Sequence, residues 1–366
     1  MVADLLLQVP IVDMPVADLL LLLIAAFGGG AFGAALGALP AFCFTGFAVL
    51  AAEGARLLSG GSDALDAPGI LGAIAFGPVF GPHVAFAGGV AAAAYAARKE
   101  GVMYEPEDGD YHVAKDIAYA LGTRPDVLAV GGIFGMIGAL GTAISGALAL
   151  PWDPIAIMVV VSAVLARLAF GYPIIGAGDR DILDMSPFER GEERSPPEGR
   201  SDVATDGGTQ TATRLAVEPW LPHQYEWPNV AAIGLVTGLL GGWIALATGS
   251  PFLAFGISAA LLTFLNLGVE NIPVTHHMTL PASTAALAFA ADPTGMTQVA
   301  AIAIAGVFGV YGALVGELVQ RIFYAHSDTH FDPPAAAIVV ATFTIVVLAI
   351  VGVFPSTSWV PNLGLV

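Results

Sequence analysis

The sequence has few charged residues, almost no lysine and a single cysteine. Only 11% of its 366 residues are charged, whereas soluble domains carry about 25%. Because 56% of the residues are hydrophobic, the composition excludes an ordinary soluble domain and predicts an all-α integral membrane protein. The lone Cys43 excludes a disulfide within one chain, so it does not indicate a redox compartment.

The charge that is present is strongly acidic. The chain has 30 acidic and 12 basic residues, which gives a net charge of −18. This sign of charge disfavours nucleic acid as a partner. Acidic, lysine-poor surfaces suit a high-salt cytoplasm, where screening weakens their self-repulsion. We therefore predict a halophilic archaeon as the source; the alternative is a protein that is merely acidic.

About ten apolar stretches divide the chain, each near the roughly 20 residues needed to cross a bilayer. They lie at 17–37, 41–58, 69–97, 127–150, 154–172, 229–248, 251–268, 274–291, 298–323 and 333–354. We expect a first transmembrane repeat over 17–172, an acidic linker over 173–228 and a second repeat over 229–354. The middle of the linker, 189–213, is polar and rich in proline and glycine, so it should be poorly ordered.

Two of these stretches have features of broken helices. In 69–99, Gly-Pro pairs at 77–78 and 81–82 precede His83. Proline fits the first turn of a helix but not its interior, so a second half-helix should start near His83. The stretch 274–291 has a similar polar start and an internal proline, which predicts a second broken helix. In hydrocarbon, such breaks persist only where protein or a water-filled cavity satisfies the backbone.

Several motifs occur twice in the same order, which indicates an internal duplication. Aligning the alanine-rich ends of the two broken stretches places His83 on His277 without a gap. Further pairs are 132–140 with 306–314, 152–154 with 331–333, Gly29-Gly30 with Gly241-Gly242, and Pro40 with Pro251. Five spans per repeat is an odd number, so the repeats should have inverted orientations, as in many secondary transporters. A re-entrant hairpin at either broken stretch would change this parity.

The distribution of basic residues predicts the orientation. With the amino terminus outside, the cytoplasmic loops hold nearly all basic loop residues and the outside loops hold only Arg56. We therefore expect a multi-pass protein of the cell membrane, surrounded by lipid, with a cytoplasmic central linker. The 45 glycines, often at small-xxx-small spacing, let helices approach closely, and we expect a homo-oligomer.

The histidines at the broken stretches are the best candidates for a solute pathway. An ionisable residue inside a membrane segment is a functional hypothesis by default. Histidine can relay protons near neutral pH, and a helix start attracts anions. The alternative is a hydrogen-bonded packing histidine at a helix end. The candidate pathway residues are His83, His277, His276, Thr279, Pro82 and Pro281.

Four further residues are candidates for coupling or gating. Glu270 and Asn271 follow the span 251–268 and could bind a cation, although an ordinary loop charge explains them equally well. Glu317 lies four residues before Arg321, which is the spacing of a helical salt bridge. Arg167 lies inside a predicted span and needs a partner or an interfacial position.

Other polar residues suggest structural roles. Asp153 and Asp332 each precede a proline at the start of a span, which is typical of helix caps. The segment 326–332 contains alternating histidines and aspartates that could bind a divalent cation, but the first repeat has no counterpart, so we predict a solvated loop and no metal site. No phosphate-binding loop, zinc spacing or catalytic triad pattern is present, and we predict neither a cofactor nor an enzyme.

One short stretch resembles a known family. The glycine-rich first span followed by Leu39-Pro40 is similar to the large membrane subunit of tripartite tricarboxylate transporters. The similarity covers only 28–42, and Pro40 lacks the following glycine of that family. No residue roles are transferred on this basis.

These observations predict a permease or channel, passive or proton-coupled, for a small neutral or anionic solute. Its pathway would lie at the repeat interface, where helix amino-termini favour anions over cations. The alternative is a structural membrane protein that forms oligomers or arrays without transport, which the scarcity of charge within the spans supports. A membrane enzyme acting on a lipid is the third hypothesis.

Overall fold

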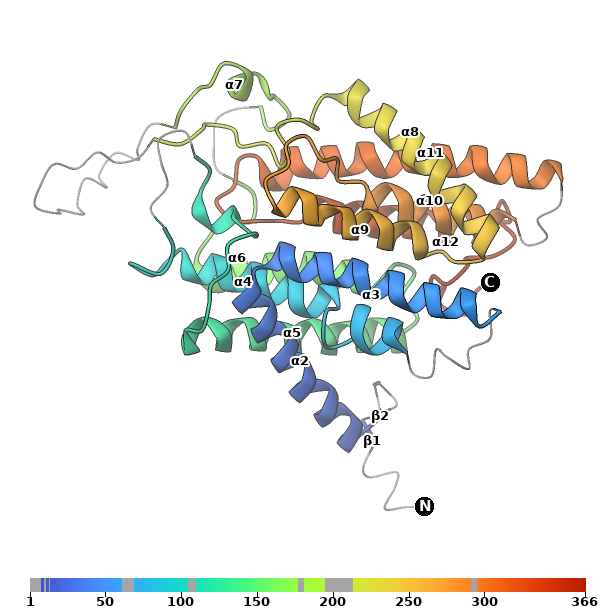
Figure 1. Ribbon diagram of the computed structural model, residues 1–366, viewed down its shortest axis with the longest axis horizontal. Helices are drawn as coiled ribbons and strands as arrows, with labels where there is room; N and C mark the ends of the chain where they lie inside the picture. Colours follow the sequence, from blue (N-terminus) through green and yellow to red (C-terminus); the bar gives the residue numbers. More distant parts are fainter. Residues whose placement is uncertain are drawn as a thin grey trace, which may run out of the picture.

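The computed structural model of the protein is built almost entirely from helices (Figure 1). It describes residues 8–9, 11–12, 14–60, 69–104, 110–176, 181–194, 213–290 and 295–366. The main helices of the first half are α2 (Val16–Leu36), α3 (Ala38–Leu58), α4 (Ala87–Ala96), α5 (Pro125–Ala147) and α6 (Pro154–Phe170). Those of the second half are α8 (Trp227–Thr248), α9 (Leu253–Asn266), α10 (His276–Phe289), α11 (Met296–Val319) and α12 (Pro333–Ile350).

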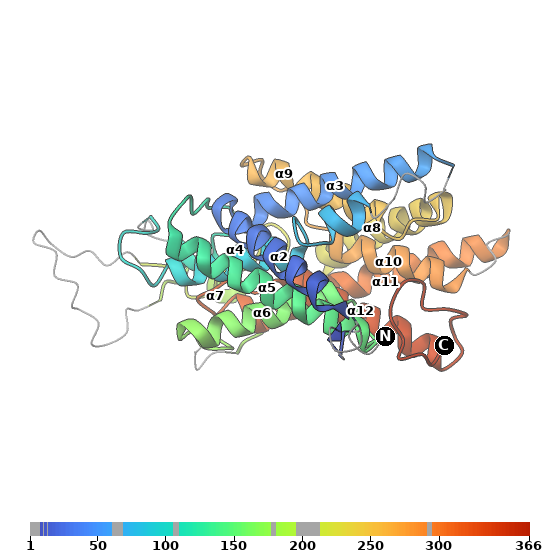
Figure 2. The ribbon, with the colours of Figure 1, turned by 90° about the horizontal axis from the view of Figure 1, so that it is seen from below.

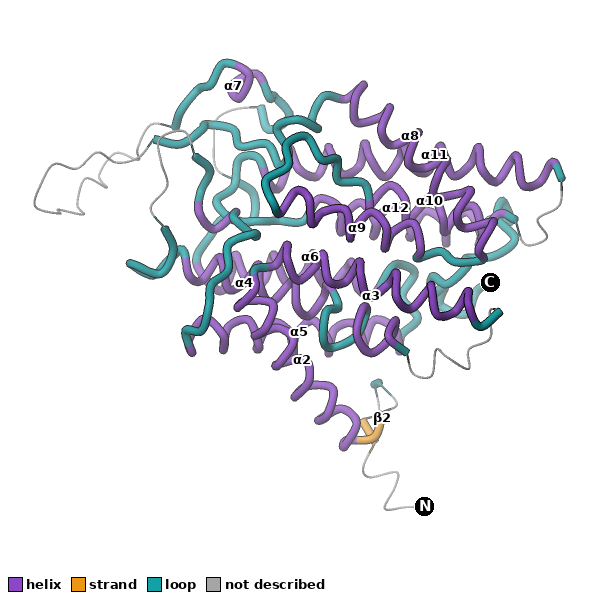
Figure 3. Tube along the Cα trace, in the orientation of Figure 1, coloured by secondary structure: helices purple, strands orange, loops and turns teal. Residues whose placement is uncertain are grey.

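The smaller elements are short. Strands β1 (Gln8–Val9) and β2 (Met14–Pro15) pair antiparallel near the amino terminus. The helical turns are η1 (Ile70–Ala75), η2 (Pro82–Phe86), η3 (Val113–Lys115), α7 (Ser186–Glu189) and η4 (Gln320–Tyr324). Helix α7 and the described linker segments lie with other loops at one end of the helix bundle, on the left of Figure 3. The segment 189–213, expected to be poorly ordered, lies mostly outside the described residues.

Six helices in the described part of the chain are long and apolar enough to cross a membrane. They are α2, α3, α5, α8, α11 continued by η4, and α12. Helices α6 and α9 are also apolar but have 17 and 14 residues, fewer than the roughly 20 that span hydrocarbon alone. Large apolar side chains such as Ile24, Leu240 and Trp243 are exposed. Apolar outer faces on helices are compatible with a membrane protein.

The two stretches predicted to be broken differ from each other. In the first, turn η1 ends at Ala75, and η2 begins at Pro82 and continues into α4, so the break lies where the Gly-Pro pairs predict it. The second is not broken, because α10 is one continuous helix with Pro281 inside it. Pro281 lacks the N–H that would bond the carbonyl of His277. That carbonyl instead packs against Gly312 of α11.

Helices that the predicted duplication would pair make similar contacts in the two halves. Helix α2 packs on α5, and α4 packs on both; likewise α8 packs on α11, and α10 packs on both. Helix α6 packs on α4 and α5, and α12 packs on α10 and α11. The halves meet through like pairs, α3 against α9 and α6 against α12. In Figure 2 these two pairs lie toward opposite edges of the molecule.

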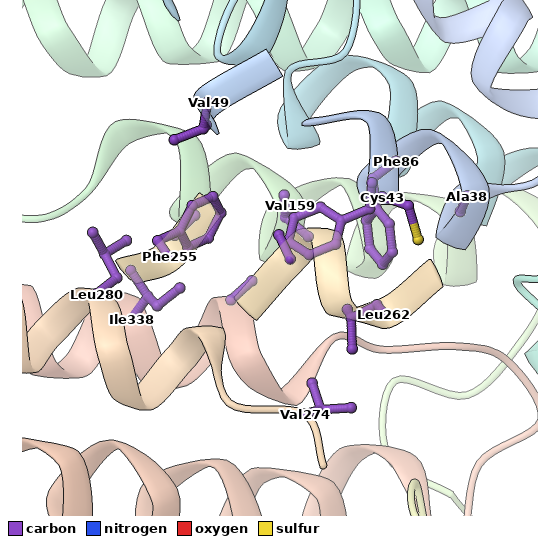
Figure 4. Close-up of a cluster of buried hydrophobic side chains, with 14 of the residues drawn as sticks. Ala38, Cys43, Val49, Phe86, Val159, Phe255, Leu262, Val274, Leu280 and Ile338 are labelled. Carbon is purple, nitrogen blue, oxygen red and sulfur yellow. The ribbon is translucent and has the colours of Figure 1, made fainter. Parts of the chain in front are cut away.

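The core at this contact is apolar and draws side chains from both halves. Phe86 and Val159 from the first half meet Phe255, Leu280 and Ile338 from the second half (Figure 4). Each of these residues is at most 5% exposed. Residues of both halves therefore form one hydrophobic cluster at this contact.

Candidate functional site

A cavity of about 460 Å³ lies where the two halves meet. Its walls come from α3, η2 and the start of α6 on one side, and from α9, α10 and the start of α12 on the other. Phe252 and Leu265, at opposite ends of α9, both line it, so it extends about 20 Å along that helix. Small-molecule sites have volumes of this order.

Several wall positions occur as matched pairs, one from each half. The alignment that places His83 on His277 also matches η2 with the first turns of α10, and the Asp-Pro motifs match α6 with α12. These predicted alignments pair ten of the wall residues: Pro82 with His276, Phe86 with Leu280, Asp153 with Asp332, Ala156 with Ala335, and Val159 with Ile338.

Helices α3 and α9 add one more pair through their mutual contact. Gly46 of α3 lies against Ala259 of α9, and Gly256 of α9 lies against Val49 of α3. This reciprocal contact matches Gly46 with Gly256. At the same offset Phe42 matches Phe252, and both side chains line the cavity.

The wall is mostly apolar and unusually aromatic. Its aromatic members are Phe42, Phe76, Phe86, Trp220, Phe252, Phe255, Tyr324 and Trp359. Its polar members are Lys115, Asp116, Thr142, Asp153, His276, His330 and Asp332. Such a site can surround an apolar body and offer it a few fixed polar contacts.

The structure separates the predicted histidines. His276 lines the cavity between the rings of Phe42 and Phe255, with centroid distances of 4.8 and 5.9 Å. His83 and His277 are buried against α5 and α11 instead, and neither belongs to the cavity wall that the described residues form. The Nδ1 atoms of all three rings have no hydrogen-bond partner among the described residues.

The other predicted pathway residues lie close by. Pro82 is part of the cavity wall. The Thr279 hydroxyl donates to the carbonyl of His276 at 3.3 Å, so it bonds back to its own helix. Pro281 is buried within α10. Of the six predicted pathway residues, the described wall contains Pro82 and His276.

Glycine allows each histidine segment to approach its neighbouring helix. A Cβ atom on Gly138 of α5 would lie 1.6 Å from the carbonyl oxygen of His83. A Cβ atom on Gly312 of α11 would lie 2.3 Å from the carbonyl oxygen of His277. No side chain fits at either position. These glycines therefore allow η2 to lie close against α5 and the start of α10 to lie close against α11.

The two aspartates at the cavity are helix caps, as the sequence predicts. Oδ1 of Asp153 accepts hydrogen bonds from the N–H groups of Ile155 and Ala156, at 2.8 and 3.2 Å. Oδ2 of Asp332 accepts from the N–H of Ala335 at 2.8 Å, and its Oδ1 lies 3.4 Å from Nε2 of His330. Oδ2 of Asp153 has no hydrogen-bond partner among the described residues.

Arg167 is fully buried and holds the loop between η4 and α12. Its Nε donates to Oγ1 of Thr329 at 2.8 Å, and its Nη2 donates to the carbonyl of Phe323 and to Oγ of Ser327 at 2.7 and 2.8 Å. Carbonyl and hydroxyl oxygens therefore supply the partner that the sequence required. Arg167 thus ties α6 to this loop, and it is not part of the described cavity wall.

Glu317 also has a structural partner. Its Oε1 lies 2.6 Å from Nε of Arg321, which confirms the predicted salt bridge. Arg321 also donates to the carbonyls of Leu183 and Tyr225 at 2.6 and 2.9 Å, so the pair ties the linker to the end of α11.

Glu270 and Asn271 lie away from the main cavity. Both are exposed in the loop after α9. They border a second, more open pocket together with Trp220 and His223. The predicted coupling residues therefore do not gather in one site.

The sequence did not indicate an ion cluster at the linker end of the cavity, which is built around a buried lysine–glutamate pair. Nζ of Lys115 lies 2.5 Å from Oε2 of Glu218, and each side chain is at most 1% exposed. Arg214 joins Glu218 to Asp328, at 3.2 and 2.5 Å, and Arg194 also pairs with Asp328 at 3.3 Å. Lys115 lines the cavity as well. The rarity of lysine could have drawn attention to Lys115, since the acidic chain has only one other lysine.

Lys115 keeps its proton in this cluster. Burial lowers the pKa of Lys115 to about 8, and the Glu218 carboxylate opposes that shift. At neutral pH the ammonium is therefore mostly charged, and Glu218 balances its charge. Little of that positive charge is left to attract a solute.

Together these features define a class of protein. The chain is all-helical, has several helices suited to a membrane, and encloses an aromatic cavity between two similarly packed halves. Over residues 11–363 it matches a family of unknown function, DUF7973, and it belongs to that family. Neither the curated proteins nor the solved structures give a match.

Proposed function

We propose that the protein is a permease for a small solute and that the cavity between the halves is its pathway. The matched pairs of wall residues are the observation that carries this proposal. In transporters built from inverted repeats, the solute site lies at the repeat interface near the middle of the membrane. A wall with equivalent positions from both halves is what such an interface provides.

The packing supports two five-span repeats of opposite orientation. Equivalent helices make equivalent contacts in each half, and the halves meet through like pairs. The contacts also favour a different register for α2. Gly30 lies against Gly131 and Gly135, and Gly238 lies against Ala305 and Gly309 in the same way. Gly30 then matches Gly238, one helical turn before the Gly242 that the sequence motif suggested.

Helix starts inside the bundle support a site near the midplane. The N–H of Asp153 donates to Oγ1 of Thr342 at 3.0 Å. Thr342 lies ten residues beyond Asp332, so the starts of α6 and α12 are about 15 Å apart along the axis. Residues at the starts or ends of α6, α9 and α10 line the cavity, as does η2, which continues into α4. We count these short helices as completing ten spans, with the amino terminus outside and the linker cytoplasmic.

The two ends of the cavity differ. The ion cluster of Lys115, Glu218 and their partners closes the linker end. Trp359 and Pro361, from the carboxyl-terminal tail, line the cavity beyond α12. His276 and the His330–Asp332 pair place titratable groups at the wall, which suits a proton-coupled cycle as well as a passive one.

An osmotic swelling assay tests this function across several classes of solute at once. Proteoliposomes should swell faster than empty liposomes in iso-osmotic solutions of at least one solute class among amines, amino acids, carboxylates and polyols. An Ala335→Trp substitution should abolish the increase, because the indole would fill the cavity. Light scattering measures the swelling rate.

The matched control is Leu240→Trp, because Leu240 is 56% exposed on the outer face of α8. This variant should transport like the wild type. Swelling equal to that of empty liposomes with every solute class would contradict the permease proposal, and so would flux that is insensitive to Ala335→Trp. Either result would favour a structural role.

A further inference from the structure

We propose that the solute is an amphipathic organic cation, with an aromatic or alkyl body and a protonated amine or quaternary ammonium. This inference rests on the proposed function for its transport step, but binding can be tested by itself. It reverses the preference for anions that the helix starts alone suggested. Three observations carry it: the aromatic wall, an unpaired carboxylate and the balanced charge of Lys115.

The wall requires an apolar body. Eight aromatic side chains line the cavity together with leucines, alanines, prolines and branched aliphatic residues. A polyol or a hydrated inorganic ion would lose water there without gaining partners for most of its polar atoms. An organic cation differs, because aromatic faces attract its charge as well as its body.

An unpaired carboxylate faces the same space. Asp153 lines the cavity and is 5% exposed. Its Oδ1 is occupied by two backbone N–H groups, whereas its Oδ2 has no hydrogen-bond partner among the described residues. An ionised carboxylate in an apolar cavity is costly unless a cation accompanies it. A bound ammonium group would supply that cation.

An anionic solute has less to bind. Lys115 is the basic residue of the described wall that is charged at neutral pH, and Glu218 already neutralises it at 2.5 Å. The amino-termini of α6 and α12 are capped by Asp153 and Asp332, so their dipoles are offset by carboxylates. With neutral histidines, the charged groups of the wall sum to a negative value, which repels an anion.

His276 can complete the site. Its ring lies between the rings of Phe42 and Phe255, and its Nδ1 has no partner among the described residues. A neutral imidazole nitrogen accepts a hydrogen bond from an ammonium N–H. The site would then hold the charged end of the solute by Asp153, with His276 as a further acceptor, and its body by the aromatic rings.

Three probes of nearly identical shape test the charge preference. They are the phenethylammonium ion, neutral 2-phenylethanol and the phenylacetate anion. Binding is measured by equilibrium dialysis to the full-length protein in zwitterionic nanodiscs, with empty nanodiscs subtracted. We expect the cation to bind at least about tenfold more tightly than the alcohol, which is the effect of one modest charge interaction, and phenylacetate to bind most weakly.

The Asp153→Asn variant separates charge from structure. Asparagine caps helices about as well as aspartate, so the fold should survive while the charge is lost. The cation should then bind about tenfold more weakly, while 2-phenylethanol should bind as before. Asp126→Asn, at an exposed site on α5 outside the described wall, should leave all three affinities unchanged.

The outcomes distinguish this inference from the proposed function. Tighter binding of phenylacetate, absence of binding by all three probes, or a cation affinity unchanged by Asp153→Asn would overturn the cation assignment. The swelling assay would still stand in each case. The permease proposal itself would be contradicted only by the absence of flux for every solute class, or by flux that is unchanged in the Ala335→Trp variant.

Discussion

Replacing Glu218 by glutamine is expected to destabilise the protein by about 3–5 kcal/mol, the usual effect of breaking a buried ion pair. Glu218 is 0% exposed and neutralises Lys115, whose side chain is 1% exposed. Glutamine preserves the shape but leaves the Lys115 ammonium buried without a countercharge. Arg214 would lose the same partner. The midpoint of thermal unfolding in detergent, or of unfolding by titrated denaturing detergent, measures the change.

An exposed pair provides the control. Arg124 and Asp126 are 51% and 38% exposed, and Arg124→Gln should cost less than about 1 kcal/mol because solvent screens such pairs. Adding Lys115→Met to Glu218→Gln should recover part of the loss, since the unpaired ammonium is then removed. If Glu218→Gln changes stability no more than Arg124→Gln, the cluster does not hold the linker to the helices.

Replacing Gly138 by alanine is expected to cost about 3 kcal/mol, at the upper end of the usual range for overpacking. The new Cβ atom would lie 1.6 Å from the carbonyl oxygen of His83, and backbone cannot rotate away as a side chain can. Helix α5 would have to move away from η2, which borders the cavity. Gly312→Ala should act in the same direction through the carbonyl of His277.

Gly146 is the matched control on the same helix, because a Cβ atom there would meet nothing within 4 Å. Gly146→Ala should stabilise the protein by about 0.5–1 kcal/mol through helix propensity alone. Thermal unfolding midpoints of the three variants provide the comparison. Equal stability of Gly138→Ala and Gly146→Ala would show that the close approach to His83 is not required.

Local features of the sequence predicted much of the fold. Each predicted apolar stretch overlaps one main helix of the described residues, although only six of these helices are long and apolar enough to cross a membrane. The Gly-Pro pairs located the break before η2. Asp153 and Asp332 cap their helices because the Asp-Pro pattern acts within a single turn. The spacing of Glu317 and Arg321 predicted their salt bridge for the same reason.

Features that depend on distant partners were not predictable from sequence. Helix α10 continues through Pro281, and the carbonyl of His277, which lacks the proline's N–H, packs against Gly312, far along the chain. Arg167 finds its partners in a loop about 160 residues away. The Lys115–Glu218 pair joins a loop of the first half to the linker, and no local pattern indicates that contact.

The candidate site shows the same division. The predicted duplication pairs two segments that both line the cavity, η2 and the start of α10. Of the side chains predicted for the pathway, Pro82 and His276 belong to the described wall, whereas His83 and His277 lie against α5 and α11. Neighbouring positions on a helix face different directions, so packing against the adjacent helices decides which of two successive side chains reaches the cavity.

Thiol accessibility tests most directly whether the cavity is a solute pathway. In a Cys43→Ala background, Val159→Cys and Ile338→Cys place one thiol on each matched wall, and Val340→Cys serves as an outward-facing control because Val340 is 38% exposed. Membrane vesicles are treated with a charged, membrane-impermeant thiol reagent, and total thiols are counted after unfolding. If the cavity is a solute pathway, both wall thiols should react in the native protein, whereas the control thiol, in contact with lipid, should not. Wall thiols that react only after unfolding would show a closed, dry interface and would contradict a pathway between the halves.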